Sequence, residues 1–524
     1  MRLPCDETVS QSATGEAPCS AKARPWILVA TILGSSMAFI DSTVVNVALP
    51  ALQVTFHATV VGVQWVVESY GLFLGALILV GGSLGDLFGR RRVFVAGVGM
   101  FALASVVCGV SSSIHELIFA RSVQGIGAAL LVPGSLAIIS KSFDQQSRGQ
   151  AIGTWSGFTA MTTAVGPVLG GWLVEHASWR WAFFINLPIA VAVITISFWR
   201  IPESRSPTPG HLDGRGALLA TFGLSGIVNG LIESARLGWR HPLVSGSLIV
   251  GIACLVGFAF VEARATSPMV PLTLFRNPRF RGANLITLFL YAALGIFFFL
   301  FPLNLIQVQG YSSTATGAAI LPLILLVFLL SRWSGGLVAR YGPRLPLIAG
   351  PLVAGLGFGM FGLASIGSDY WRTFLPAIIA LGFGMAVTVA PLTTVVMNSV
   401  DQERVGTASG INNAAARVAG VLAIAVFGTV MVSAFSSRLN HTLLNLSLPG
   451  PVLQQVQTDE IKLAGAQVPD NLDPGTRAAV EELIGEAFIF GFRIVMFICA
   501  GLSLASAAIA LLMIPMDSGL ATQT

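Results

Sequence analysis

The chain has 524 residues, of which 54% are hydrophobic and 10% are charged, and its net charge is +5. Because soluble domains carry about 25% charged residues, a water-soluble fold could not bury this much apolar surface, and a soluble enzyme or binding domain is excluded. The cations stand at the ends of apolar segments rather than on a basic face with interleaved aromatics, so a nucleic-acid partner is also excluded.

A polar segment, residues 1–25, precedes the first apolar stretch, and we expect it to be a cytoplasmic tail rather than a signal peptide. Fourteen stretches then have the roughly 20 apolar residues that a transmembrane helix needs. They are 26–48, 61–82, 93–110, 116–140, 150–174, 181–199, 215–233, 243–262, 284–307, 315–339, 345–367, 372–398, 406–435 and 488–514. The sequence therefore predicts an all-α polytopic membrane protein.

An even number of spans places both termini on one side of the bilayer. When that side is the cytoplasm, most of the 29 basic residues fall in cytoplasmic segments, including the Arg90–Arg92 cluster beside the second span. This distribution satisfies the positive-inside rule. We expect both termini in the cytoplasm and the lipid bilayer as the surrounding medium.

The chain contains an internal repeat. GGSLGDLFGRRRVFVAG (Gly81–Gly97) recurs in degraded form as GGLVARYGPRLPLIAG (Gly335–Gly350), and DQQSRGQAIG after span 4 recurs as DQERVGTASG after span 12. Spans 1–6 thus pair with spans 9–14, and parallel six-span halves are the layout of major facilitator transporters. The predicted fold is two six-helix bundles with two inserted helices.

The predicted domain boundaries follow from this repeat. They are a tail (1–25), an N-terminal bundle (26–200), two inserted helices (201–270), C-terminal bundle helices 9–13 (271–435), an extracellular segment (436–487), the last span (488–514) and a second cytoplasmic tail (515–524). In the extracellular segment, Pro451–Leu463 is expected to form an amphipathic helix. Asp473 and Pro474 are typical of a helix start, so a helix should begin there and run into the last span.

Placing a charged side chain inside a membrane span costs free energy, so the charged residues found there are candidates for a functional role. The first half holds Asp41, Glu68 and Arg121, whereas the second half holds only the cations Arg332, Arg417 and Arg493. Burial favours the neutral form of a carboxyl group, so Asp41 and Glu68 are candidates for a proton site that also binds substrate. Alternatively, Arg121 or backbone donors hold these carboxylates in purely structural pairs. Arg121 is either a proton-relay partner or a fixed counter-ion.

Two segments are candidates for gating. Gly166-Pro167 interrupts the hydrogen-bond ladder of span 5, and Gly170 and Gly171 allow a neighbouring helix to approach; the segment is either a hinge and seal between the halves or a simple kink. Near the cytoplasmic end of span 2, Asp86, Arg90 and Arg91 can pair with span ends of the other half, or serve only to set the topology.

Other side chains are candidates for lining a substrate cavity, although aromatic residues in such a chain face lipid or core more often than ligand. They are Asn46, Gln64, Trp65, Gln124, Trp155, Phe158 and Arg417. The five cysteines have no CxxC spacing, and we expect neither a metal nor a cofactor.

Several motifs in order resemble the fourteen-span drug:proton antiporters of the major facilitator superfamily. They are DSTVVNVALP in span 1, GSLGDLFGRRR after span 2, RSVQGIGAA in span 4, GPVLGG in span 5 and SWRWAFFINLP at span 6. The resemblance implies a proton-coupled exporter of amphipathic, drug-like small molecules in the bacterial cytoplasmic membrane, working as a monomer. It places Asp41 on the family's acidic span-1 position, Arg121 on its span-4 arginine and Gly166-Pro167 on its antiporter signature.

The sequence departs from this family at Glu68, an additional acid, and in span 10, which carries Arg332 instead of the acid found in some exporters of dications. Together with Arg417, this leaves room for zwitterionic or anionic substrates. A second hypothesis is export of an endogenous lipid or lipid-linked envelope precursor. A membrane-embedded enzyme is disfavoured because none of the six histidines lies in the middle of a span. An ATP-driven pump is disfavoured because no GxxxxGK[ST] motif occurs.

Overall fold

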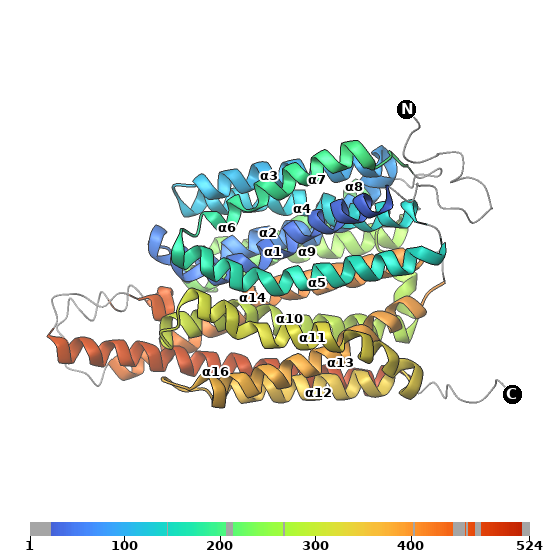
Figure 1. Cartoon of the computed structure of the whole chain (residues 1–524). Coiled ribbons are helices and arrows are strands. Elements are labelled where there is room, and N and C mark those ends of the chain that lie inside the picture. Colours follow the sequence, from blue (N-terminus) through green and yellow to red (C-terminus); the bar gives the residue numbers. More distant parts are fainter. Residues whose placement is uncertain are drawn as a thin grey trace.

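Helices make up the regular structure of the chain in the computed structural model, which describes residues 23–143, 145–205, 213–265, 268–401, 404–443, 456, 460–466 and 473–515. No strand occurs among these residues, and the long helices lie side by side (Figure 1). The predicted all-α fold is confirmed. Almost all of the predicted tails lie outside the described residues.

The N-terminal half is a bundle in which α2 and α3 pack against α4, and α1 packs against α5 and α7. Its helices are α1 (Arg24–Phe56), α2 (Val60–Phe88), α3 (Arg90–Val110), α4 (Ile114–Ser142), α5 (Gln145–His176), α6 (Trp181–Phe184) and α7 (Asn186–Arg200). Predicted span 6 is thus divided into the short α6 and α7. Gly89, with φ 113°, connects α2 to α3 in a backbone conformation that favours glycine.

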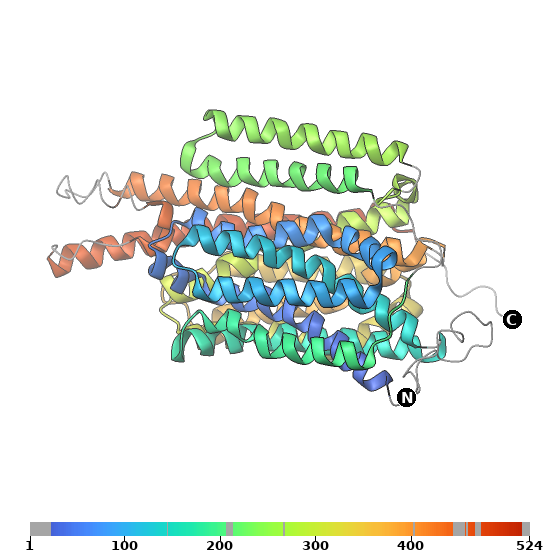
Figure 2. The same ribbon diagram turned by 90° about the horizontal axis from the view of Figure 1, so that it is seen from above.

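Two inserted helices, α8 (Gly214–Leu237) and α9 (Pro242–Arg264), pack mainly against each other. They lie at the edge of the bundle (Figure 2), where α8 also contacts α2 of the first half and α14 of the second. The insert therefore adjoins both halves.

The C-terminal half repeats the arrangement: α11 and α12 pack against α13, and α10 packs against α14 and α16. Its elements are η2 (Leu272–Arg276), α10 (Pro278–Leu303), η3 (Asn304–Val308), α11 (Ser313–Tyr341), α12 (Arg344–Phe361), η4 (Tyr370–Phe374), α13 (Leu375–Asn398), α14 (Val405–Leu443), η6 (Glu460–Gly465) and α16 (Pro474–Met513). Helix α1 begins and α16 ends at the same end of the bundle (Figure 1).

Thirteen helices in the described part are long and apolar enough to cross a membrane. The remaining predicted span, 150–174, corresponds to α5, which has 32 residues. Helix α5 is not one of the thirteen and is rich in Gly, Thr and Ser. It nevertheless packs against α1 and α11 inside the bundle.

The segment between α14 and α16 differs in part from the prediction. Asp473 caps α16 by accepting from the backbone N–H of Thr476, a bond that lowers the pKa of its carboxyl, and the predicted helix start is confirmed. The amphipathic helix expected at Pro451–Leu463 falls mostly outside the described residues, but Glu460–Gly465 forms a 3₁₀ helix. Helix α14 also continues to Leu443, past the predicted end of span 13.

The two halves meet along two helix pairs, α2 with α14 and α5 with α11, and we call this contact the seam. At the predicted outer end of the seam, Gln53 Nε2 of α1 donates to the Lys462 carbonyl of η6 at 2.9 Å. Gln307 Nε2 of η3 donates to Gln53 Oε1 at 2.9 Å. Gln53 thus links α1 to both η6 and η3 of the second half at that end.

Candidate functional site

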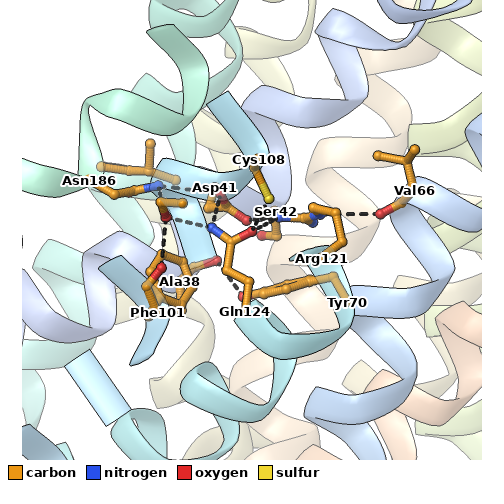
Figure 3. Close-up of polar contacts among 12 residues, drawn as sticks. Ala38, Asp41, Ser42, Val66, Tyr70, Phe101, Cys108, Arg121, Gln124 and Asn186 are labelled. Carbon is orange, nitrogen blue, oxygen red and sulfur yellow. Dashed lines mark hydrogen bonds and ion pairs between the residues drawn. The ribbon is translucent and has the colours of Figure 1, made fainter. Parts of the chain in front are cut away.

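Asp41, in the middle of α1, is the centre of a buried polar cluster in the first half (Figure 3). Its Oδ2 accepts from Arg121 Nη1 on α4. Its Oδ1 accepts from Gln124 Nε2 at 2.8 Å and from Asn186 Nδ2 of α7 at 3.4 Å. Four polar side chains from three helices therefore converge where apolar packing would otherwise be expected.

Arg121 is only 1% exposed and has acceptors besides Asp41. Its Nη1 donates to Gln124 Oε1 at 2.6 Å, and its Nε donates to the Val66 carbonyl of α2 at 3.2 Å. The guanidinium also stands over the Tyr70 ring, 4.2 Å from its centroid. If Asp41 were protonated, these contacts would remain to hold the arginine in place.

The cluster combines a carboxyl group with an arginine that has further acceptors. When the Asp41 carboxylate is charged, it forms an ion pair with Arg121. When it is protonated, the ion pair is lost, and Arg121 keeps its hydrogen bonds to the Gln124 and Val66 oxygens. Ser105 of α3 extends the network, because its Oγ accepts from Gln124 Nε2 at 2.9 Å and from Asn186 Nδ2 at 3.3 Å. The cluster thus connects α1, α3, α4 and α7, with α2 supplying Val66 and Tyr70.

The sequence prediction considered Asp41 and Arg121 as partners and named Gln124 only as a possible cavity-lining residue. It did not single out Asn186, Ser105 or Tyr70 as parts of the network. The signal for Asn186 was an amide in an otherwise apolar span, inside the SWRWAFFINLP motif.

Glu68 lies outside this cluster, although it is fully buried in α2. Neither of its carboxylate oxygens has a hydrogen-bond partner among the described residues. On the same helix, Gln64 Nε2 reaches the Ile424 carbonyl of α14 at 3.5 Å, and Trp65 Nε1 donates to Glu233 Oε1 of α8 at 3.2 Å. Because residues three and four apart share a helix face, Glu68 faces the junction of α2 with α8 and α14.

The span-5 glycines and proline divide between two partners. Gly166 and Gly170 pack against α1, where a Cβ at Gly170 would lie 3.0 Å from Val44 Cα. Gly171 lies against the Ser313 backbone of α11, and the Pro167 carbonyl lies against Gly317 of α11. The segment therefore touches both halves, as a seal would, with no room for larger side chains.

The charges after α2 pair within the first half. Asp86 Oδ1 accepts from Arg90 Nη2 at 2.6 Å, one turn away on the chain. Glu203, after α7, accepts from the backbone N–H groups of Arg91 and Arg92 at 3.1 and 3.2 Å. Of the two alternatives for Asp86, Arg90 and Arg91, pairing with span ends of the other half is not seen among the described residues, where their partners all belong to the first half.

The predicted cavity-lining residues occupy different environments. Gln124 and Gln64 are 0% and 1% exposed and are engaged as described above, and Trp155 donates from Nε1 to Ser35 Oγ at 3.1 Å. Phe158 is 51% exposed. Asn46 donates to the Ser42 carbonyl at 3.2 Å while its Oδ1 is buried without a partner among the described residues.

Arg417 is half-buried in α14, directly opposite Gly75 of α2. Its guanidinium carbon lies 5.3 Å from the centroid of the Phe39 ring of α1. It therefore lies in the seam, with α1 and α2 on the other side. The side chain of Arg332 lies outside what the structure describes.

The helical architecture and the buried intramembrane charge cluster define a polytopic membrane transporter. The family model of the Major Facilitator Superfamily matches residues 31–424. The chain therefore belongs to the Major Facilitator Superfamily, and it is a transporter rather than an enzyme.

Relatives with antibiotic-resistance roles match most of the chain. It is 32% identical to the tetracenomycin C resistance and export protein of Streptomyces glaucescens, over 95% of this chain and 94% of that protein. It is 36% identical to the multidrug resistance protein Stp of Mycobacterium tuberculosis, over 83% of this chain and 80% of that protein.

Solved structures support the fold alone, because their sequence identity is low. A bacterial homologue of the human lysosomal transporter Spinster, in an inward-facing and unoccupied conformation, has a TM-score of 0.65 at 19% identity. The match covers 94% of this chain and 98% of that one.

Proposed function

We propose that the protein is an efflux antiporter that exports amphipathic, drug-like compounds in exchange for protons by alternating access. The observation that carries this proposal is the Asp41–Arg121 pair, which is buried in one half of a fold whose relatives are named as resistance and export proteins. A carboxylate kept in the membrane interior at a cost of at least a few kcal/mol needs a role, and exchange of a proton supplies one.

In this mechanism, protonation of Asp41 removes the charge that holds Arg121, and the guanidinium keeps its bonds to Gln124 and Val66. Loss of the proton restores the pair. Because Asp41 contacts α4 and α7 together, the protonation state of one carboxyl changes the packing of several helices of the first half. Glu68 is proposed as a second proton or substrate site, since its buried oxygens have no described partner.

Gating is assigned to the seam. Gly166, Pro167, Gly170 and Gly171 form the seal between α5, α1 and α11, and Asp86 with Arg90 and Arg91 stabilises the α2–α3 connection on the predicted cytoplasmic side. The protein acts as a monomer in the bacterial cytoplasmic membrane, with both termini in the cytoplasm.

Export of an endogenous lipid or lipid-linked envelope precursor is the second candidate. It is favoured by Arg417, a cation in the seam without an ion pair among the described residues, which suits an acidic headgroup.

Drug susceptibility of a strain that overexpresses the protein, with and without a protonophore, tests the proposal. We expect resistance to rise for several amphipathic compounds and to vanish with the protonophore. Unchanged susceptibility, together with altered envelope lipids on deletion of the gene, would favour the second candidate.

A further inference from the structure

Arg417 differs from the other described in-span arginines in lacking an ion-pair or hydrogen-bond partner among the described residues. Arg121 is paired with Asp41, and Arg493 Nε donates to the Ala364 carbonyl at 2.7 Å. No ion pair or hydrogen bond joins the Arg417 side chain to any residue that the structure describes. Since an unpaired cation at membrane depth is costly, Arg417 calls for a partner from outside the chain.

Among the acids in the spans of the two six-helix halves, neither Asp41 nor Glu68 serves as that partner. Asp41 is occupied by Arg121, Gln124 and Asn186, and the buried Glu68 oxygens have no hydrogen-bond partner among the described residues.

The surroundings of Arg417 are suited to an apolar molecule with one charged group. Phe39 presents its ring to the guanidinium from across the seam. Asn413, one helical turn earlier on the same face of α14, is exposed, so the helices of the first half do not close this face completely. An aromatic ring thus lies beside the cation, and the preceding turn of α14 is exposed.

We infer that Arg417 binds the anionic group, a carboxylate, phenolate or phosphate, of an amphipathic molecule whose apolar body lies against Phe39. That the bound molecule is an exported substrate rests on the proposed function. Binding of the anion at Arg417 does not depend on proton coupling. It names the substrate class as acidic amphiphiles, with either a free compound or a lipid headgroup as the source of the anion.

The site lies close to the proton cluster along α1. Phe39, whose ring faces Arg417, stands two residues before Asp41. An anion on Arg417 therefore lies near the group proposed to exchange protons.

Equilibrium binding of a matched probe pair, 1-pyrenebutyric acid and its uncharged methyl ester, to the purified full-length protein in nanodiscs tests this inference. The two probes share one ring system and differ by a carboxylate. We expect the acid to bind at least tenfold more tightly than the ester. Arg417→Gln should abolish the difference, Arg417→Lys should retain part of it, and the control Arg493→Gln should leave it intact.

Equal binding of acid and ester by the unmodified protein, or no binding of either, would overturn the inference, as would an unchanged preference in a folded Arg417→Gln variant. Thermal unfolding of each variant shows whether it is folded, and Arg417→Lys keeps the test informative if the glutamine variant is not. Competition by phosphatidylglycerol in the nanodisc would identify a lipid headgroup as the anion, and lack of competition would identify a free compound. If the protein binds the acid selectively but efflux does not respond to a protonophore, the proposed antiport function is refuted and the anion site at Arg417 is still supported.

Discussion

Asp41→Asn tests the proton site most sharply, because asparagine keeps the size of the side chain while removing its charge and its proton chemistry. In the structure, Asp41 accepts from Arg121, Gln124 and Asn186 inside the first half. The variant would leave the Arg121 guanidinium, 1% exposed, without its counter-ion.

The expected loss of stability follows from that geometry. Breaking a buried ion pair by removing one partner costs about 3–5 kcal/mol. Arg121 keeps the Gln124 and Val66 oxygens, and asparagine still offers an acceptor, so we expect the lower end, about 3 kcal/mol. The double variant Asp41→Asn/Arg121→Gln should be less destabilised than the sum of the two single variants, with a coupling of about 1–3 kcal/mol.

The assay is uptake and release by protein reconstituted in liposomes, combined with thermal unfolding of the same preparations. Asp41→Asn should fold with a lower unfolding temperature and should lose transport driven by a pH gradient. Glu116→Gln, which changes an exposed acid at the start of α4, is the matched control and should retain transport. Full pH-driven transport by Asp41→Asn would refute the role given to this carboxyl.

The remaining predictions concern Glu68 and the seam. Glu68→Gln should weaken export of cationic compounds. Glu68→Leu should raise the free energy of unfolding by about 1–3 kcal/mol, because it removes buried oxygens that lack partners among the described residues. An unchanged substrate profile in both variants would mean that Glu68 serves only in packing. Gly171→Leu should force α5 away from Ser313 on α11. A cysteine placed at Ser313 should then react faster with a membrane-impermeant thiol reagent than it does without the Gly171 substitution. Equal reaction rates would argue against a seal between α5 and α11. Gln53→Ala should open the outer end of the seam, because it removes the contacts to η6 and Gln307. The cysteine at Ser313 should again be labelled faster. Gln309→Ala is the control, since it leaves those contacts in place.

Much of the fold could be predicted from the sequence because a lipid environment imposes strong constraints. Long apolar stretches have few alternatives to helices, since backbone polar groups must be satisfied within the segment. The repeat of Gly81–Gly97 as Gly335–Gly350 supplied the two halves and isolated the insert, which forms α8 and α9. The boundaries were less accurate: α14 and α16 both extend beyond the apolar spans, because helices continue into water when caps such as Asp473 allow it.

Side-chain partners were harder to predict, since they depend on how helices rotate against one another. The Asp41–Arg121 pair was one of the alternatives weighed, whereas Asn186 entered the network unforeseen because a single amide gives little signal in a long apolar span. Pairing of the charges after α2 with the other half was one of two alternatives, but Glu203 of the same half lies nearer and accepts from the start of α3. No pattern in one sequence encodes that proximity.

Direct measurement of proton movement by the unmodified protein tests the central claim. In liposomes that contain a pH-sensitive dye, with no imposed pH gradient, a substrate gradient should drive protons in the direction opposite to substrate flow, and a protonophore should collapse the signal. Substrate transport at full rate with no accompanying change in internal pH would contradict proton exchange.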